Sequence, residues 1–194
     1  TEPLTTSTFF SGKTFKTIVS VLRELGYQTI EHKILNAKDF GVPQNRERIF
    51  IFGYIDFTFF EFPEPKKIQT KVGDILDDEV SDKFTISDKM WTSAIRRKEN
   101  NRKRGYGFGF SLFNKESEYT STISARYYKD GSEIWIDQDG KNPRMITPNE
   151  ARKLQGFPEG FEIPVSNLQA YKQFGNSVSV PVIRAIAERI VKLL

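Results

Sequence analysis

Three polar side chains stand two positions apart just before a short apolar run: Gln44, Arg46 and Arg48. In an extended segment, residues two apart point to the same side, so two guanidinium groups and an amide are expected to face one spot. Because a guanidinium offers a rigid fork of donors, such a cluster suits a phosphate or the edge of a nucleobase. The alternative is a solvated turn whose arginines pair with nearby acidic residues, as isolated Arg-x-Arg pairs commonly do.

The elements that position these side chains are a loop and a strand. Gly41 and Pro43 predict the loop, and the apolar run 49–52 predicts a buried strand. Upstream, apolar residues at helical spacing predict a helix over 12–25, and alternation predicts a strand over 27–35. This helix–strand–loop–strand unit is typical of a piece of an α/β domain. The pattern leaves open whether the two strands pair antiparallel.

A second group of candidate residues is strongly basic. Six basic residues fall within nine positions: Arg96, Arg97, Lys98, Arg102, Lys103 and Arg104. They lie on a predicted helix within 82–104 that Ser87 or Asp88 caps, and a run of alternating glycine and aromatic residues follows at 105–110. Since basic side chains neutralise phosphates, the cluster indicates nucleic-acid contact rather than a solvated helix. The aromatic residues by themselves are predicted to pack in the core.

The region after the basic helix is predicted to be irregular and rich in strands. Strands are predicted over 121–128 and 133–137, with turn signals at 129–131 and 139–140. Residues from about 80 to 145 therefore look like a small unit inserted into the chain.

The C-terminal part is predicted to be helical. Thr147-Pro148-Asn149-Glu150 forms a capping box with a proline start, so a helix begins there and stops at Gly156. A single helical turn is predicted over 169–174, broken by Gly175-Asn176-Ser177. An amphipathic helix is predicted from 180 to 194, and its apolar face is read as core packing.

Composition excludes several function classes. The chain has 194 residues, a net charge of +4 and a pI near 9.2, a mild bias toward anionic partners. With no Cys, it holds no disulfide, thiolate metal site or cysteine nucleophile. One histidine, His32, does not make a His-based metal site, so no metal is predicted. No apolar run approaches a membrane span and no signal peptide is visible, so a soluble, intracellular protein is expected.

Three segments together carry a resemblance to a known family. They are Gln44-Asn45-Arg46-Glu47-Arg48, Leu154-Gln155-Gly156-Phe157-Pro158 and Gln173-Phe174-Gly175-Asn176-Ser177-Val178, in that order. They resemble the eighth, ninth and tenth motifs of the DNA cytosine-5 methyltransferases, and the region between the first two resembles that family's target recognition domain. The likeness covers nearly the whole chain from Gly12, and three motifs in order are highly specific.

The resemblance implies a fold and a division into domains. The implied fold class is α/β: the C-terminal part of a doubly wound, S-adenosylmethionine-dependent methyltransferase domain, plus a small, irregular, strand-rich target recognition domain. Residues 1–64 would belong to the catalytic domain, 65–146 would form the recognition domain, and 147–194 would return to the catalytic domain. By the family's mechanism the target cytosine is flipped out of the duplex, and its C5 receives the methyl group.

The resemblance also implies roles at the motifs. Gln44, Arg46 and Arg48 would hold the flipped cytosine and its phosphates, with Arg48 nearest the base. Asn176 and Ser177 would help to line the S-adenosylmethionine pocket, and Gly175 would allow the tight backbone there. Residues of the ninth motif would brace the recognition domain: Glu150, Gln155 and Gly156. Asn149 departs from the family, which commonly has Arg there, and this puts one interdomain ion pair in doubt.

Double-stranded DNA is the implied partner of the recognition region. Thr122, in a pair that resembles the family's Thr-Leu, would pack near the target nucleotide's backbone. Arg126 is a candidate reader of guanine, because an arginine can fork onto its edge. The segments around these residues resemble enzymes whose sites begin CC and end GG, so a CCGG-like or CCNGG-like site is predicted. The basic residues predicted to contact DNA are Arg96, Arg97, Arg102, Lys103 and Arg104.

Three parts of the family's active site are missing from this sequence. The Gly-rich cofactor loop, the Pro-Cys motif with the nucleophile and the Glu-Asn-Val motif with the acid are not found, which matches the absence of Cys. We therefore expect no activity from the chain alone, and activity in bacterial cytoplasm with a Cys-bearing N-terminal portion or a complementary subunit. A stand-alone, sequence-specific DNA-binding module derived from such an enzyme is the alternative. Fragment and split subunit stay equivalent, and a restriction partner stays open.

Overall fold

The computed structural model describes residues 12–66 and 68–193, and it divides into two compact units. The first unit holds the described residues of Thr1–Asn36, Glu47–Pro65 and Arg184–Leu194. The second holds those of Ala37–Arg46 and Lys66–Ile183. The loop 37–46 and the helical region 147–183 thus fall in the same compact unit as residues 68–146. Their polar side chains are buried against one another, as described below. The division into catalytic and recognition domains that the resemblance implies stays a prediction.

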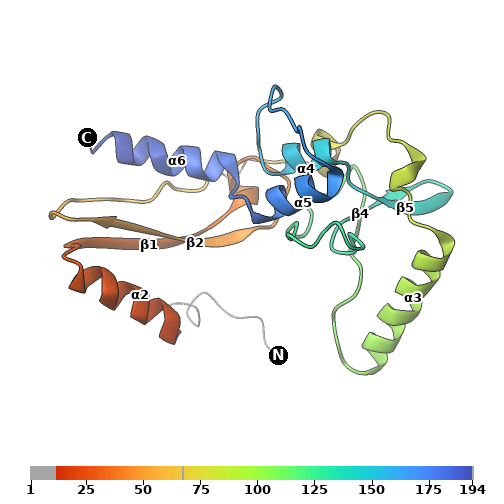
Figure 1. The fold of residues 1–194 in the computed structure, drawn as a ribbon, viewed down its shortest axis with the longest axis horizontal. Helices are drawn as coiled ribbons and strands as arrows, with labels where there is room; N and C mark the ends of the chain where they lie inside the picture. Colours follow the sequence, from red (N-terminus) through yellow and green to blue (C-terminus); the bar gives the residue numbers. More distant parts are fainter. Residues whose placement is uncertain (1–11, 67, 194) are drawn as a thin grey trace. The chain divides into compact units, whose positions relative to one another are not determined.

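The first unit is built on a hairpin flanked by a helix (Figure 1). Helix α2 spans Lys13–Glu24, and Gly26 follows it in the left-handed conformation with φ of 93°. Strands β1 (Thr29–Asn36) and β2 (Glu47–Tyr54) pair antiparallel in unbroken register, from Thr29 opposite Tyr54 to Asn36 opposite Glu47. This confirms the predicted helix and strands, and it decides the pairing that the sequence left open. The run 49–52 is half-buried, however, so the prediction of a buried strand there is wrong in that respect.

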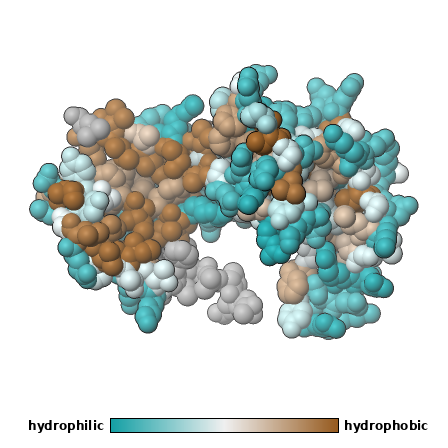
Figure 2. Space-filling model, viewed as in Figure 1, coloured by the Kyte–Doolittle hydropathy of each residue, from teal (hydrophilic) through white to brown (hydrophobic). Residues whose placement is uncertain are grey.

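Aromatic residues form the packed part of the first unit. Phe60 is buried and stacks on Phe52 of β2 with ring centroids 3.8 Å apart, and Phe62 meets Phe60 edge-on at 5.0 Å. No described residue of α2 is buried. Large apolar side chains stay exposed: Ile18, Val21, Leu25, Ile55, Phe57 and Phe59. Hydrophobic residues accordingly gather over this unit's surface in Figure 2.

The second unit combines short helices with a small three-stranded sheet. Its elements are 3-10 helices η1 (Ala37–Phe40), η2 (Val72–Ile75) and η3 (Asp82–Phe84), helices α3 (Asp88–Lys103), α4 (Pro148–Leu154) and α5 (Asn167–Asn176), and strands β3 (Leu112–Phe113), β4 (Trp135–Gln138) and β5 (Lys141–Met145). Strand β4 pairs parallel with β3 and antiparallel with β5. Helix α6 (Val180–Val191) begins in this unit and ends in the other.

The strand predicted over 121–128 is wrong. The segment is a loop that turns at 125–130, although Ile123 and Tyr127 are fully buried. Two of its backbone amides donate to side chains rather than to a neighbouring strand, and the first of them, that of Ile123, donates to Gln44 Oε1 at 3.0 Å. The Ser124 amide likewise donates to Glu133 Oε1 at 3.3 Å.

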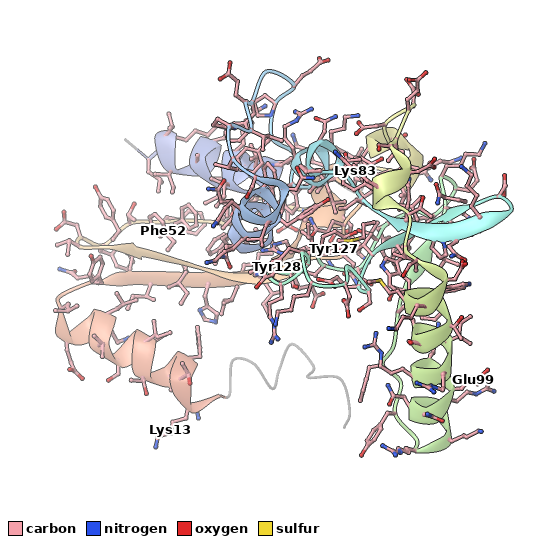
Figure 3. The ribbon with its side chains drawn as sticks, turned by 45° about the vertical axis from the view of Figure 1, so that its right-hand side comes forward. Lys13, Phe52, Lys83, Glu99, Tyr127 and Tyr128 are labelled. Carbon is pink, nitrogen blue, oxygen red and sulfur yellow. The ribbon has the colours of Figure 1, made fainter. Side chains whose placement is uncertain are left out.

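The core of the second unit includes two tyrosines with satisfied hydroxyl groups. Tyr127 donates to the Ile134 carbonyl at 2.7 Å and accepts from the Ile146 amide at 2.8 Å. Tyr171 donates to the Ile146 carbonyl at 2.6 Å. Burial raises the pKa of both tyrosines, so both stay neutral. Tyr171 thereby ties α5 to the residue that follows β5, and Tyr127 ties its loop to the same residue. Figure 3 labels Tyr127 among the densely packed side chains of this unit.

Helix α3 begins where the sequence predicted it. The Ser87 side chain accepts from the Met90 amide at 3.3 Å, so Ser87 rather than Asp88 is the cap. The first turns are anchored by Trp91, whose ring lies 4.9 Å from Phe110 and 6.0 Å from the buried Trp135. The other end of the helix carries the basic residues.

Candidate functional site

Gln44 ties the loop before β2 to two other segments. The side chain is completely buried, and its Nε2 donates to the Leu154 carbonyl at 3.1 Å and lies 3.4 Å from Gln155 Oε1. Its Oε1 accepts from the Ile123 amide at 3.0 Å. Since a buried amide is stable only when its donors and acceptor are paired, Gln44 fixes this loop in one position.

Arg46 brings the loop onto the end of α5. The residue is 4% exposed, and Nη1 donates to the Ile123 carbonyl at 3.0 Å. Nη2 donates to the carbonyls of Gly175 at 3.0 Å and Ser177 at 2.8 Å. A guanidinium can hold several acceptors at once because its donors form a fixed fork. The segments that resemble the eighth and tenth motifs therefore meet through this one side chain.

Arg48 differs from the other two residues of the predicted cluster. It lies on β2 in the first unit, its side chain is exposed, and it donates to the Glu47 carbonyl at 2.6 Å. Partial burial lowers the pKa of Arg48, but a guanidinium stays charged. The extended geometry expected for all three residues begins only at Glu47, so Gln44 and Arg46 point inward and Arg48 does not.

Gly175 is required by close packing rather than by a turn. The sequence predicted that Gly175 breaks the preceding helix, but α5 runs through it to Asn176, and Ser177 is the C-cap. A Cβ on Gly175 would lie 2.3 Å from the Ser124 carbonyl carbon and 2.4 Å from the Ala125 nitrogen. The missing side chain thus lets backbone rest on backbone, and this keeps the helix end beside the loop that Arg46 binds.

The two predicted cofactor residues differ in their bonding. Asn176 is exposed, and its side chain makes no hydrogen bond to any residue that the structure describes. The Ser177 hydroxyl donates to the Phe174 carbonyl at 2.8 Å, while its own carbonyl accepts from Arg46. The amide of Asn176 is therefore available to a ligand, and Ser177 mainly closes the helix.

Glu150 sits at the centre of a buried polar network. Its carboxylate is fully buried and accepts from both terminal nitrogens of Arg144 at 2.8 Å. It also accepts from the Thr147 amide at 2.7 Å, which completes the predicted capping box, and from the Asp77 amide at 2.9 Å. All of its donors are supplied by the second unit, so α4, β5 and the segment around Asp77 are fixed together.

Asp77 is a second hub, which sequence reasoning missed. It accepts from Thr147 Oγ1 and Asn149 Nδ2, each at 2.7 Å, and pairs with Lys153 at 2.9 Å. Burial raises the pKa of Asp77, but the hydrogen bonds from Lys153, Thr147 and Asn149 outweigh it and leave the pKa lowered. Asn149, where the family commonly has Arg, thus donates its amide hydrogen bond to this carboxylate. No local sequence pattern around Asp77 or Arg144 predicts these contacts.

The basic helix offers mostly exposed charges. Arg97 lies 3.7 Å from Asp130, so part of its charge is balanced within the chain. The others among the predicted contacts are exposed and form no ion pair within the described residues: Arg96, Arg102, Lys103 and Arg104. Thr122 donates to the Asn45 carbonyl at 2.6 Å, which ties it to the loop before β2. The guanidinium of Arg126 is exposed and makes no hydrogen bond to a described residue.

The aromatic residues after α3 divide into two groups. Phe110 packs on Trp91 and on Trp135, as a core placement predicts. Tyr106 and Phe108 are 53% and 64% exposed, so the core prediction is wrong for them. The chain turns at Gly105, outside the core, and of the three aromatic residues that follow only Phe110 contacts the core tryptophans.

Within residues 12–66 and 68–193, no cluster of three or more His, Asp or Glu is arranged to hold a metal ion. No helix of that part of the chain is both long and apolar enough to cross a membrane.

The chain is similar in sequence to known proteins along most of its length. The family described as C-5 cytosine-specific DNA methylase matches residues 6–192. The type II methyltransferase M.NlaX of Neisseria lactamica is 59% identical over 179 residues, 92% of this chain and 57% of that protein. M1.ScrFI of Lactococcus lactis subsp. cremoris is 57% identical over 188 residues, 94% of this chain and 48% of that protein. The chain spans about half the length of these curated relatives.

Solved structures share the fold, and this agrees with the sequence relatives. A methyltransferase of Entamoeba histolytica matches 95% of this chain and 60% of its own with a TM-score of 0.74 at 24% identity. A Spodoptera frugiperda DNMT2 variant matches 94% of this chain and 63% of its own with a TM-score of 0.75 at 20% identity. The predicted α/β methyltransferase fold class is therefore confirmed. With a family match over nearly all of its length, the chain belongs to the C-5 cytosine-specific DNA methylase family.

Proposed function

We propose that this chain is the part of a DNA methyltransferase that binds duplex DNA and completes the cofactor pocket. The whole enzyme transfers a methyl group from S-adenosylmethionine to C5 of cytosine. Family membership and the names of the curated relatives support this reaction. Because the chain contains no Cys, the attacking thiolate comes from the N-terminal portion or from a second subunit, and the chain alone is inactive. Its substrate places the enzyme with DNA in the bacterial cytoplasm.

The observation that carries the proposal is the contrast between Arg46 and Arg48. Gln44 and Arg46 are buried and bonded to backbone and side-chain groups of the second unit, so they hold the loop. Arg48 follows on β2 with an exposed, charged side chain. We therefore assign contact with the flipped cytosine and its phosphate to Arg48, and indirect positioning to Gln44 and Arg46.

The residues at the end of α5 fit a cofactor in part. The free amide of Asn176 offers both a donor and an acceptor, which suits the polar groups of S-adenosylmethionine. Ser177 contributes through the position of the backbone, since its hydroxyl is bonded to Phe174. When bound, S-adenosylmethionine supplies the electrophilic methyl group. The rest of its pocket would come from the missing N-terminal portion.

DNA recognition is assigned to the second unit. Arg96, Arg102, Lys103 and Arg104 supply phosphate contacts, with Arg97 partly committed to Asp130. Thr122 lies on the loop that binds Asn45, and the exposed Arg126 is free to fork onto guanine. We retain a CCGG-like or CCNGG-like site as the proposed target.

The apolar surface of the first unit is assigned to contact with the missing portion. Phe57 and Phe59 are 86% and 75% exposed, far above what a stable isolated surface favours. The relatives are about twice as long, so a further portion of comparable size is available to cover it.

The test is a joined enzyme read out by methylation sequencing. The 194-residue chain is fused behind the N-terminal portion of M.NlaX, in place of that protein's own C-terminal part, and expressed in cells without cytosine-5 methylation. We expect 5-methylcytosine at one defined site that the inserted chain determines. Fusion proteins that fold but methylate nothing would contradict the proposal. Tight, specific DNA binding by the chain that ignores S-adenosylmethionine would favour the DNA-binding module instead.

A further inference from the structure

The loop after α3 is a built feature that returns along the helix (Figure 1). Gly105 turns the chain with φ of 78°, and the Tyr106 amide donates back to the Asn101 carbonyl at 2.9 Å. Asn101 Nδ2 in turn donates to the Phe108 carbonyl at 3.1 Å. Lys98 donates to the Phe110 carbonyl at 3.3 Å, and its ammonium lies 4.1 Å from the centre of that ring. The side chains of Asn101 and Lys98 thus hold the loop against the helix at two positions.

This fastening presents two aromatic rings to the outside. The rings of Tyr106 and Phe108 are stacked, with centroids 5.2 Å apart and planes 24° from parallel. Both are more than half exposed, whereas the next aromatic, Phe110, is packed between Trp91 and Trp135. Exposed aromatic rings are costly in water, so a stacked pair held in place is expected to have a partner.

Charge identifies the chemistry of that partner. Arg102, Lys103 and Arg104 directly precede the ring pair and are exposed, and no acidic residue occurs between Glu99 and Glu116. A rigid aromatic pair set among uncompensated cations matches a polyanion that also offers flat apolar faces. Nucleic acid has both, and exposed aromatic side chains are used to stack on bases or to wedge between base steps.

Gly107 adds a second, independent observation. A Cβ placed there would meet no atom within 4 Å, and its backbone is not in the left-handed region. Neither packing nor conformation within the chain explains a glycine at this position. A backbone without a side chain between two exposed rings allows close approach of a ligand.

We propose that Tyr106 and Phe108 stack on bases of the target duplex while Arg102, Lys103 and Arg104 hold the flanking phosphates. This inference rests on the proposed function, because it names a further DNA contact of the same recognition region. It assigns the ring pair a role separate from the readout by Arg126. Helix α3, on which Figure 3 labels Glu99, then serves as a rigid arm that carries the pair to the DNA.

The test measures DNA affinity of the joined enzyme with a labelled short duplex that contains CCGG and CCNGG sites. The double variant Tyr106→Ala/Phe108→Ala is expected to bind about tenfold more weakly or worse, as removal of base–aromatic stacking usually does. Its salt dependence should stay as in the wild type, because no cation is removed. Replacing Arg102, Lys103 and Arg104 by alanine should instead reduce the slope of log affinity against log salt by about one unit for each lost contact.

Single variants separate stacking from fold and from simple apolar contact. Phe108→Trp should keep affinity and Phe108→Leu should lose it, because only the former retains a flat ring. Gly107→Ala should weaken DNA binding without lowering the melting temperature, since its new methyl group meets only open space. Phe161→Ala is the matched control: Phe161 is 43% exposed and lies on another loop of the same unit, so DNA affinity should not change.

The experiment separates results that contradict the role of the two rings from results that contradict the proposed function. Methylation by the wild-type fusion reports on the function, whereas the ratio of affinities reports on the rings. Unchanged DNA affinity in the double variant overturns the inference, and so does a Phe108→Leu protein that binds like the wild type. Loss of methylation with unchanged DNA affinity would mean that the rings contact another protein segment, which also overturns it.

Discussion

Replacing Glu150 by Gln tests the buried network that fixes α4, β5 and the Asp77 segment together. The carboxylate accepts four hydrogen bonds, two of them from Arg144, and neither side chain is more than 7% exposed. The amide of Gln turns one acceptor into a donor that faces existing donors. It also leaves the guanidinium of Arg144 buried without a counter-charge.

The expected cost follows from the burial. Removing one partner of a buried ion pair destabilises a protein by about 3–5 kcal/mol, because the remaining charge stays desolvated. At roughly 2–4 °C per kcal/mol for a chain of this size, the melting temperature should fall by about 6–20 °C. Urea unfolding followed by tryptophan fluorescence measures the same loss, since Trp135 is fully buried in this unit.

A matched control and a double variant make the test specific. Glu116→Gln breaks a pair with Lys71 that is 2.5 Å long but whose side chains are 63% and 59% exposed, so little change is expected. Arg144→Met/Glu150→Gln should be less destabilised than the sum of its single variants, because no unpaired buried charge remains. Equal stability of Glu150→Gln and Glu116→Gln would refute the reasoning.

Three further predictions concern packing, pH and catalysis. Gly175→Ala should destabilise the chain by about 1–3 kcal/mol, because its methyl group meets fixed backbone, whereas Gly160→Ala, with open space around it, should be neutral by thermal unfolding. Asp77→Asn should lower the free energy of unfolding at neutral pH, because the ionised carboxylate stabilises the fold above the ordinary Asp pKa of about 4. The wild type loses this advantage as the pH falls through the lowered pKa of Asp77, so the two proteins should become equally stable in acid. A difference in unfolding free energy that does not shrink at low pH would contradict this. In the joined enzyme, Arg48→Ala should lower methyl transfer by about 100-fold or more with an unchanged melting temperature, and near-normal rates would remove Arg48 from the site.

Local signals in the sequence were sufficient for much of the fold. Ser87 and the capping box at Thr147 mark their helix starts because a cap needs only neighbouring residues. Alternation predicted β1 and a continuous apolar run predicted β2, and Gly26 and Gly156 end helical segments in left-handed conformations. These features depend on contacts within a few residues, which is the range over which a pattern can be read.

The interior of the candidate site was not predictable in the same way. Gln44 bonds to Leu154 and Arg46 to Ser177 across more than a hundred residues, so their inward orientation leaves no local pattern. The segment 121–128 resembles a strand in its sequence, and Ile123 and Tyr127 within it are buried. Two of its backbone amides, however, donate to side chains of other segments instead of to a neighbouring strand. Gly175 reads as a helix breaker, yet it is explained by the backbone packed against it.

The most direct test of the account is methyl transfer from labelled S-adenosylmethionine to duplex DNA by purified chains. The 194-residue chain, a Cys-bearing N-terminal portion from a relative, and their mixture are assayed side by side. The account predicts transfer only by the mixture, and Arg48→Ala in this chain should lower that transfer by about 100-fold or more. Methyl transfer by the 194-residue chain alone would contradict it, as would an inactive mixture of two folded, associated chains.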